Sequence, residues 1–402
     1  MRRKNMSISK RASQISPSLT LAITAKAKKM SAEGISVIGF GAGEPDFNTP
    51  DYIIEAAKKA LDDGMTKYTP AAGIMPLREA ICAKLERDNG LSYAANQIVV
   101  SNGAKHSLFN VMEAIVDDGD EVIIPAPFWL TYPELVKMAG GVPVIVNTEE
   151  QNHFKITPDA LRAAITDKTK AFILNSPSNP TGTVYEKEEL FALAEVLEEA
   201  GIYVISDEIY EKLVYDGKKH YSIASYSEKL KEKTIVVNGM SKSYAMTGWR
   251  IGYLAAPLAI AKAIDSVQSH ATSNPNSIAQ YAALAALNGG EDFLSEMVKT
   301  FDERRKFMVE RVNAIDGLSC KTPMGAFYVL VNVSELLGKK YGEKLVSNTV
   351  ELADAMLEAG VAVVPGISFG ADEYIRLSYA ISLTDIEEGL KRIEGFVRDM
   401  TE

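Results

Sequence analysis

Residues 234–252 read TIVVNGMSKSYAMTGWRIG and combine a short apolar strand with a loop of small and cationic residues. The strand, Thr234–Asn238, is one of seven runs of four or five mostly apolar residues that alternate with helical segments. The other six runs are 97–101, 121–124, 142–146, 171–175, 202–206 and 252–256. Short apolar strands that alternate with helices are typical of a parallel sheet covered on both faces. The sequence therefore predicts an α/β fold with a mostly parallel seven-stranded sheet.

The character of the sequence changes after about residue 290. A long charged helix, from Asp292 to about Ala314, precedes short strand candidates and a helix near 345–359. This order is typical of a smaller α+β unit. We predict a large domain over residues 51–290 and a small C-terminal domain over 291–402. The N-terminal segment 1–50 shows little regular pattern and is expected to pack against the small domain.

Length and composition limit the class of protein. The chain has 402 residues, of which 47% are hydrophobic and 24% charged, values typical of a soluble globular protein with two or three domains. The 43 basic and 53 acidic side chains give a net charge of −10, which argues against nucleic acid as a partner.

Targeting signals and cysteine chemistry are both sparse. Residues 1–10 are basic, but no apolar stretch of signal-peptide length follows them, and no run approaches the roughly 18 apolar residues of a membrane span. The two cysteines, Cys82 and Cys320, lie far apart and in no metal-ligand spacing. We therefore expect a cytoplasmic protein with no membrane partner, no disulfide framework and no metal site.

Ligands of open α/β sheets bind beyond the carboxyl ends of the strands. The strand 234–238 is followed by Ser241 and Lys242, and Arg250 lies eight positions after the lysine. This set suits a phosphorylated aldehyde, because the lysine can form an imine while Ser241 and Arg250 hold the phosphate. A lone lysine in a loop could instead be an ordinary surface residue.

Two further strand ends carry groups that suit a pyridine ring. Asp207 follows the strand 202–206 and can pair with a protonated ring nitrogen, which makes the ring an electron sink. Tyr210 could donate to the phenolic oxygen of the ring, and Asn179 could bond it from the other side. Taken alone, Asp207 could equally cap a helix, and Asn179 lies in a good turn sequence, 176–182.

Other candidates have weaker signals. Gly103 and Ala104 enter a helix after the strand 97–101, where free backbone N–H groups can bind an anion. Trp129 could stack on the pyridine ring or simply pack in the core. Gly41, in GAGEPD at 41–46, offers exposed backbone to a ligand. Arg376 lies inside an apolar strand, where its partner could be a substrate carboxylate or an internal acid.

Four strings together resemble a known family. They are GMSK followed after seven residues by RIG at 239–252, NSPSNPTG at 175–182, SDEIY at 206–210, and YIRLS at 374–378. They match motifs of the class I aminotransferases, and the resemblance runs from about Ser16 to the C-terminus. It is strongest to the bacterial aspartate aminotransferases typified by thermophile enzymes. The resemblance implies a fold-type I homodimer with shared active sites, pyridoxal 5′-phosphate as the cofactor, and amino acids and 2-oxo acids as substrates.

The resemblance also implies a role for each site residue. The implied catalytic residues are Lys242, Asp207 and Tyr210. The implied cofactor-binding residues are Tyr68 (on the phosphate of the partner subunit), Gly103, Ala104, Trp129, Asn179, Asp207, Tyr210, Ser241, Lys242 and Arg250. The implied substrate-binding residues are Ser18, Thr20, Gly41, Lys105, Trp129, Asn179 and Arg376, of which Gly41, Asn179 and Arg376 hold the α-carboxylate.

Substrate choice rests on Lys105. A better-known branch of the family binds the distal carboxylate with an arginine that precedes a Ser-Asn-Pro stretch, whereas residues 267–275 here read VQSHATSNP. In the branch that this chain resembles, a lysine at the position of Lys105 serves instead, helped by Ser18 and Thr20. The implied reaction is ping-pong transfer of the amino group of L-aspartate to 2-oxoglutarate through pyridoxamine phosphate, giving oxaloacetate and L-glutamate.

Three alternatives remain open at this level. Relatives with this pattern can act on aromatic amino acids or prephenate. A β-eliminating lyase shares the lysine and the aspartate, and releases pyruvate and ammonia. A regulator in which this fold is fused to a DNA-binding module is disfavoured, because no helix-turn-helix pattern precedes Ser16.

Overall fold

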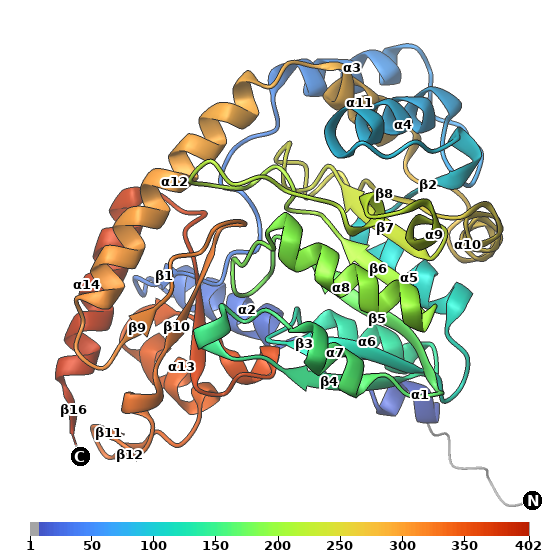
Figure 1. Cartoon of the computed structure of the whole chain (residues 1–402). Helices are drawn as coiled ribbons and strands as arrows, with labels where there is room; N and C mark the ends of the chain where they lie inside the picture. The colour runs from blue at the N-terminus through green and yellow to red at the C-terminus, as the bar shows by residue number, and fades with distance from the viewer. Residues whose placement is uncertain (1–7, 402) are drawn as a thin grey trace, which may run out of the picture.

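The computed structural model describes residues 8–401 (Figure 1). Most of the basic N-terminal stretch 1–10 therefore lies outside the described residues. Within residues 8–401, no helix has both the length and the apolar character needed to cross a membrane.

A seven-stranded sheet forms the centre of the larger part of the molecule (Figure 1). Its strands are β2 (Ile98–Ser101), β3 (Glu121–Ala126), β4 (Val142–Asn147), β5 (Thr169–Asn175), β6 (Tyr203–Asp207), β7 (Thr234–Gly239) and β8 (Gly252–Ala255). Their order is β2-β8-β7-β6-β5-β3-β4, and only β8 runs antiparallel to its neighbours. The predicted mostly parallel seven-stranded sheet is confirmed. The carboxyl ends of the other six strands consequently meet at one edge.

Helices cover both faces of this sheet because the strands are apolar on both sides. On one face, strand residues such as Ile173 and Ile235 pack with α5 (Ala104–Ile115) and α10 (Leu258–Ala271). On the other face, Phe172 packs against α8 (Lys187–Ala200). The helix α8 ends at Ala200, and the next residue, Gly201, has a positive φ of 67° that stops the helix. The remaining helices of this part are α3 (Asp51–Asp62), α4 (Met75–Asn89), α6 (Thr131–Met138), α7 (Pro158–Ala164), α9 (Glu228–Lys231) and α11 (Ser277–Asn288).

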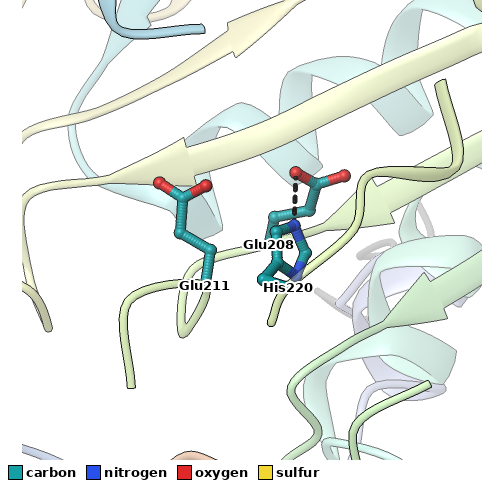
Figure 2. A group of neighbouring side chains, drawn as sticks. All are labelled: Glu208, Glu211 and His220. Carbon is teal, nitrogen blue, oxygen red and sulfur yellow. Dashed lines mark hydrogen bonds and ion pairs between the residues drawn. The ribbon is translucent and has the colours of Figure 1, made fainter. Parts of the chain in front are cut away.

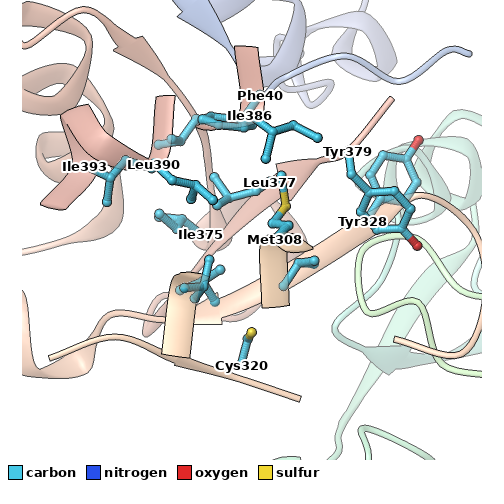
Figure 3. Packing of buried hydrophobic residues seen from close by; sticks show 14 of the residues in the cluster. Phe40, Met308, Cys320, Tyr328, Ile375, Leu377, Tyr379, Ile386, Leu390 and Ile393 are labelled. Atoms are coloured by element: carbon cyan, nitrogen blue, oxygen red, sulfur yellow. The ribbon is translucent and has the colours of Figure 1, made fainter. Parts of the chain in front are cut away.

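The C-terminal part is an α+β unit, as the sequence predicts. Its main sheet has the order β14-β15-β10-β9 and consists of β9 (Ser319–Cys320), β10 (Tyr328–Asn332), β14 (Val364–Pro365) and β15 (Tyr374–Ser378). Its helices are α12 (Asp292–Asn313), α13 (Thr349–Glu358) and α14 (Leu383–Arg398). Figure 3 shows Met308 of α12, Leu377 of β15 and Leu390 of α14 in one buried cluster. A small sheet of β11 (Lys340–Tyr341), β12 (Lys344–Leu345) and β16 (Met400–Thr401) lies at its end.

The N-terminal segment is more regular than predicted. It contains the short α1 (Lys10–Ser13) and the fourteen-residue helix α2 (Leu19–Ala32), of which no residue is fully buried. Such a helix lacks a clear apolar face, which is why periodicity did not reveal it. Next, β1 (Ile38–Gly39) pairs with β13 (Val361–Ala362), so this stretch contacts the C-terminal unit. The domain boundaries at 50 and 290 stay predictions.

Candidate active site

A cavity of about 830 Å³ opens at the carboxyl edge of the large sheet. Its wall includes loops after β3, β5, β6 and β7, the start of α5, part of α2 and strands of the C-terminal unit. All of the predicted site residues line this cavity except Gly103 and Tyr68. Segments far apart in the sequence thus bring the predicted groups together.

Lys242 lies in the loop after β7 and is half-buried. Its Nζ donates to the backbone carbonyl of Gly43 and lies 5.9 Å from the ring centre of Tyr210. Burial lowers the pKa of Lys242 to about 8, and the nearby carboxylate of Glu44 only partly opposes this shift. Roughly a tenth of the amine is therefore unprotonated at pH 7, far more than for an ordinary lysine, and only this free form acts as a nucleophile or base. These contacts do not fit an ordinary solvated surface lysine.

Asp207 ends β6 and is 3% exposed. Its Oδ2 accepts a hydrogen bond from the hydroxyl of Tyr132 at 2.7 Å, and its Oδ1 accepts one from the N–H of Ile209 at 3.3 Å. Burial raises the pKa of Asp207 to about 6, while the bond from Tyr132 acts in the opposite direction. In the described chain the next α-helix is α9, at Glu228–Lys231, so Asp207 does not serve as a helix cap.

Arg376, on β15, is 2% exposed. Its Nη1 donates to Asn179 Oδ1 at 3.0 Å, and its Nη2 donates to the carbonyl of Gly41 at 3.1 Å. The guanidinium stacks 4.3 Å from the ring centre of Tyr328. Among residues 8–401 it has no carboxylate partner, and its Nε is buried without a hydrogen bond. Burial lowers the pKa of Arg376. A buried cation without a counter-charge is expensive, so this arrangement favours an anionic ligand over an internal salt bridge.

A second anion cradle lies at the start of α5. Gly103 precedes this helix with φ 90°, and a Cβ there would lie 2.4 Å from Nη2 of Arg250. The arginine is held by the carbonyls of Thr247 and Asn102, at 2.8 and 3.3 Å. Ser241 and Ala104 line the same side of the cavity. Backbone N–H groups at a helix start, a hydroxyl and a guanidinium are the donors that a phosphate dianion needs.

Tyr210 and Asn179 line the same cavity as Lys242, Asp207 and Arg376. The hydroxyl of Tyr210 is 2.9 Å from that of Tyr328, and both rings are fully buried or nearly so. The backbone N–H of Asn179 donates to Asn175 Oδ1 at 2.9 Å, while its side chain accepts from Arg376. Asn179 therefore has a defined side-chain contact in addition to its place in a turn.

The predicted specificity residues lie at the mouth of the cavity. Lys105 is exposed, and its Nζ lies 4.8 Å from the ring centre of Trp129. Burial of part of the side chain and the charge of Arg250 lower the pKa of Lys105. On α2, Ser18 caps the helix, and the buried Oγ1 of Thr20 has no hydrogen-bond partner among the described side chains and backbone. The three residues face one cavity, and their contact with a substrate stays a prediction.

Two predicted residues do not line the cavity. Gly103 has no side chain, so the guanidinium of Arg250, which does line the cavity, can lie against its backbone. Tyr68 lies between α3 and α4 and is 89% exposed, so its ring is not packed against residues 8–401. Its expected contact with the phosphate of a partner subunit stays a prediction.

Sequence reasoning missed two residues that complete the site. Tyr132 bonds Asp207, and Tyr328 connects Arg376 with Tyr210. The available signal for Tyr132 was its position three residues after Trp129, one turn along a helix. Tyr328 had no comparable signal, because its neighbours become known only from the packing of β10 on the large part.

A polar cluster that begins with Glu208, the residue after Asp207, is drawn in Figure 2, and none of its members lines the cavity. Potential ligand atoms of Glu208, Glu211 and His220 lie within 4.8 Å of one another. Glu208 already accepts from Ser222 Oγ at 2.6 Å and lies 3.0 Å from His220 Nε2, and Glu211 forms an ion pair with the buried Lys84. Both carboxylates, of Glu208 and Glu211, are therefore already engaged by side chains of the protein. The cluster therefore supports the turn after Asp207, and the ammonium group of Lys84 already neutralises Glu211.

Comparisons with known proteins agree with this geometry. The family model for class I and II aminotransferases matches residues 35–393. An aspartate aminotransferase of Bacillus subtilis is 53% identical over 98% of this chain and 99% of its own length, and an aspartate/prephenate aminotransferase of Nitrosomonas europaea is 46% identical over 98% and 100%. The aspartate aminotransferase structure from Thermus thermophilus with maleate superposes with a TM-score of 0.92 at 44% identity, over 97% of this chain and 100% of that one. The chain therefore belongs to the class I and II aminotransferase family, whose members use pyridoxal 5′-phosphate.

Proposed function

We propose that this protein is an aspartate aminotransferase, which moves the amino group of L-aspartate to 2-oxoglutarate and gives oxaloacetate and L-glutamate. One observation carries the proposal. A lysine of lowered pKa, a buried aspartate and a buried arginine without a counter-charge all line a single cavity. These are the groups needed to hold an amino acid by its carboxylate and to move its α-proton.

The residues of the cavity fit pyridoxal phosphate. Ser241, Arg250 and the N–H groups at the start of α5 would hold the phosphate, and Asp207 would pair with the ring nitrogen. Lys242 would carry the cofactor covalently, and Trp129 would lie against its ring. When bound, the cofactor supplies a ring that accepts the electron pair left behind as the α-proton departs.

Lys242 Nζ is the base that we assign to the α-proton. Its lowered pKa lies closer to neutral pH than that of an ordinary lysine, which suits a group that accepts a proton and returns it to a neighbouring carbon. In the structure, the carbonyl of Gly43 accepts a hydrogen bond from this amine at the cavity wall. Use of one site for both half-reactions implies ping-pong kinetics, first with the amino acid and then with the oxo acid.

Arg376 would bind the α-carboxylate that every substrate shares. The guanidinium is held in place by Asn179, Gly41 and the ring of Tyr328, so little conformational freedom is lost when the substrate arrives.

Preference for a dicarboxylate rests on Lys105, with Ser18 and Thr20 beside it on the cavity wall. The Thermus relative was determined with maleate, a four-carbon dicarboxylate, which supports the same class of ligand here. A second candidate substrate is prephenate, since relatives 46% to 49% identical to this chain bear the name aspartate/prephenate aminotransferase. Prephenate also has a second carboxylate that Lys105 could bind.

A homodimer with shared active sites is part of the proposal. The exposed side chains Leu61, Met65 and Tyr68 follow one another closely in the chain, and exposed apolar groups in one segment favour an interface. A cytoplasmic location is also proposed. It is supported by the two unpaired cysteines, Cys82 and Cys320, which fit a reducing compartment.

A substrate scan tests the proposal. With 2-oxoglutarate as acceptor, we expect aspartate to be consumed much faster than alanine or phenylalanine, with glutamate formed in equal amount. Comparable or faster consumption of arogenate, the amino product of prephenate, would identify the second candidate. Release of pyruvate and ammonia without glutamate would show a β-lyase and refute the proposal.

A further inference from the structure

We propose that Tyr132 is a positioning residue that holds Asp207 ionised and aimed at the ring nitrogen of the cofactor. The same side chain braces the ring of Trp129. This inference rests on the assignment of pyridoxal phosphate to the cavity, but not on which amino acid is the substrate.

The hydrogen bond between the two residues has a defined direction. A carboxylate can only accept, so the hydroxyl of Tyr132 donates to Asp207 Oδ2, at 2.7 Å. Both side chains are buried. The other oxygen, Oδ1, accepts from the N–H of Ile209 at 3.3 Å. Two donors within the protein thus fix the plane of the carboxylate, while Asp207 still lines the cavity.

The bond crosses the edge of the sheet. Tyr132 lies in the first turn of α6, after β3, whereas Asp207 ends β6, and β5 lies between these strands. The backbone N–H of Tyr132 donates to the carbonyl of Trp129 at 3.0 Å, and the two rings meet edge to face with centres 5.4 Å apart. Tyr132 therefore connects the expected stacking ring with the expected partner of the ring nitrogen.

The surroundings of Asp207 favour its protonated form, so the hydrogen bond from Tyr132 is needed to keep it ionised. Burial favours the protonated form of Asp207, and the negative charge of Glu208 adds to this effect. Tyr132, the N–H of Ile209 and the charge of Lys242 oppose it. Burial together with the carboxylate of Asp207 raises the pKa of Tyr132 well above its ordinary value, so its hydroxyl remains a donor. Loss of this donor removes a charge-assisted hydrogen bond from the ionised carboxylate.

The test compares two ligands in the Tyr132→Phe apoprotein. One ligand is pyridoxal phosphate, and the other is a carbocyclic analogue in which C–H replaces the ring nitrogen. We expect the Kd for pyridoxal phosphate to rise about tenfold or more near pH 7.5, the effect of one charge-assisted hydrogen bond, while the Kd of the analogue changes less than about twofold. In wild type, where the pKa of Asp207 is about 6, the Kd for pyridoxal phosphate should change little between about pH 7 and 8, because the carboxylate is ionised there.

Tyr185→Phe is a matched control. It also removes a buried tyrosine hydroxyl, one that accepts from the N–H of Ile156 at 3.0 Å and does not contact Asp207. Both ligands should bind to this variant as they bind to wild type. An equal loss of both ligands in Tyr132→Phe, or no loss of either, would overturn the proposal. The first result would mean that Tyr132 acts only by packing.

A second measurement does not depend on the variant folding well. Infrared spectra of the wild-type apoprotein, with Asp207→Asn as the reference, identify the C=O band of protonated Asp207. We expect this band to be nearly absent above about pH 7 in wild type and to persist to higher pH in Tyr132→Phe. A strong band at pH 7.5 in wild type would overturn the proposal. Failure of the proposed substrate would appear only in the substrate scan and would leave these ligand measurements unchanged.

Discussion

Replacement of Lys105 by methionine should separate dicarboxylate recognition from the reaction itself. Methionine keeps the unbranched apolar stem against Trp129, which lies 4.8 Å from the ammonium group, and removes only the charge. Arg376 stays in place to bind the α-carboxylate. Activity on aspartate and glutamate should therefore fall, while activity on alanine and phenylalanine should change little.

The size of the effect follows from the position of Lys105. Two unit charges about 4 Å apart contribute about 1 kcal/mol in water and about 4 kcal/mol at a partly buried protein site. Because Lys105 is exposed at the cavity mouth, the lower part of this range applies. A loss of about 1–2 kcal/mol corresponds to a fall of roughly five- to thirtyfold in kcat/KM for aspartate.

The assay should use single half-reactions, because the acceptor 2-oxoglutarate is itself a dicarboxylate. Loss of the visible absorbance of the cofactor after mixing with aspartate or alanine gives kcat/KM for each amino acid alone. Lys26→Met is the control, since it removes an exposed lysine that pairs with Asp354 at 2.6 Å and does not line the cavity. A uniform loss for all amino acids in Lys105→Met would refute the reasoning, because it would show that Lys105 only steadies the phosphate cradle.

Lys242→Ala should abolish multiple turnover and the absorbance band of the lysine imine while cofactor still binds noncovalently, as equilibrium dialysis can show; normal turnover would mean that another lysine carries the cofactor. Arg376→Ala should lower kcat/KM for all amino acids alike by about two to four decades, since two charge-assisted bonds contribute about 3–6 kcal/mol, and a loss confined to aspartate would contradict its assigned role. Tyr68→Phe should weaken cofactor binding, and mixed dimers with Lys242→Ala chains should show partial rescue in one site; a fully active monomer, seen by sedimentation, would exclude the shared site. The pKa of Asp207 rises from 3.8 to about 6, so the folded apoprotein binds this proton more tightly than the unfolded chain. Its contribution to the free energy of unfolding is therefore lost as pH rises from about 4 to about 6, and urea titrations should show wild type losing about 2–3 kcal/mol relative to Asp207→Asn over this window. A constant difference between the two proteins would contradict the raised pKa.

The sequence predicted most of the fold because its signals are local. Each strand of the large sheet is a short apolar run, and Lys242, Asp207 and Asn179 follow such runs directly. Arg376 was recognisable as a charge inside an apolar strand. These features need no knowledge of the neighbours of a residue in space.

The features that sequence reasoning missed depend on non-local packing or lack a pattern. Tyr132 reaches Asp207 because β3 and β6 lie only two positions apart in the sheet, with β5 between them. No local run of residues encodes this strand order. Tyr328 acquires its neighbours when β10 packs on the large part. The helix α2 escaped notice because it buries no residue completely, so its apolar positions follow no strict period.

The exposure of α2 has an evolutionary consequence. Substitutions of exposed residues usually change the free energy of unfolding by less than about 0.5 kcal/mol, so this helix can accept many of them. Yet Thr20 and Thr24 of the same helix line the cavity that we propose as the substrate site. Lys242 and Asp207 belong to other segments, at the edge of a tightly packed sheet. Substrate range can therefore drift through mutations in α2 while the reaction and the stability of the protein are retained.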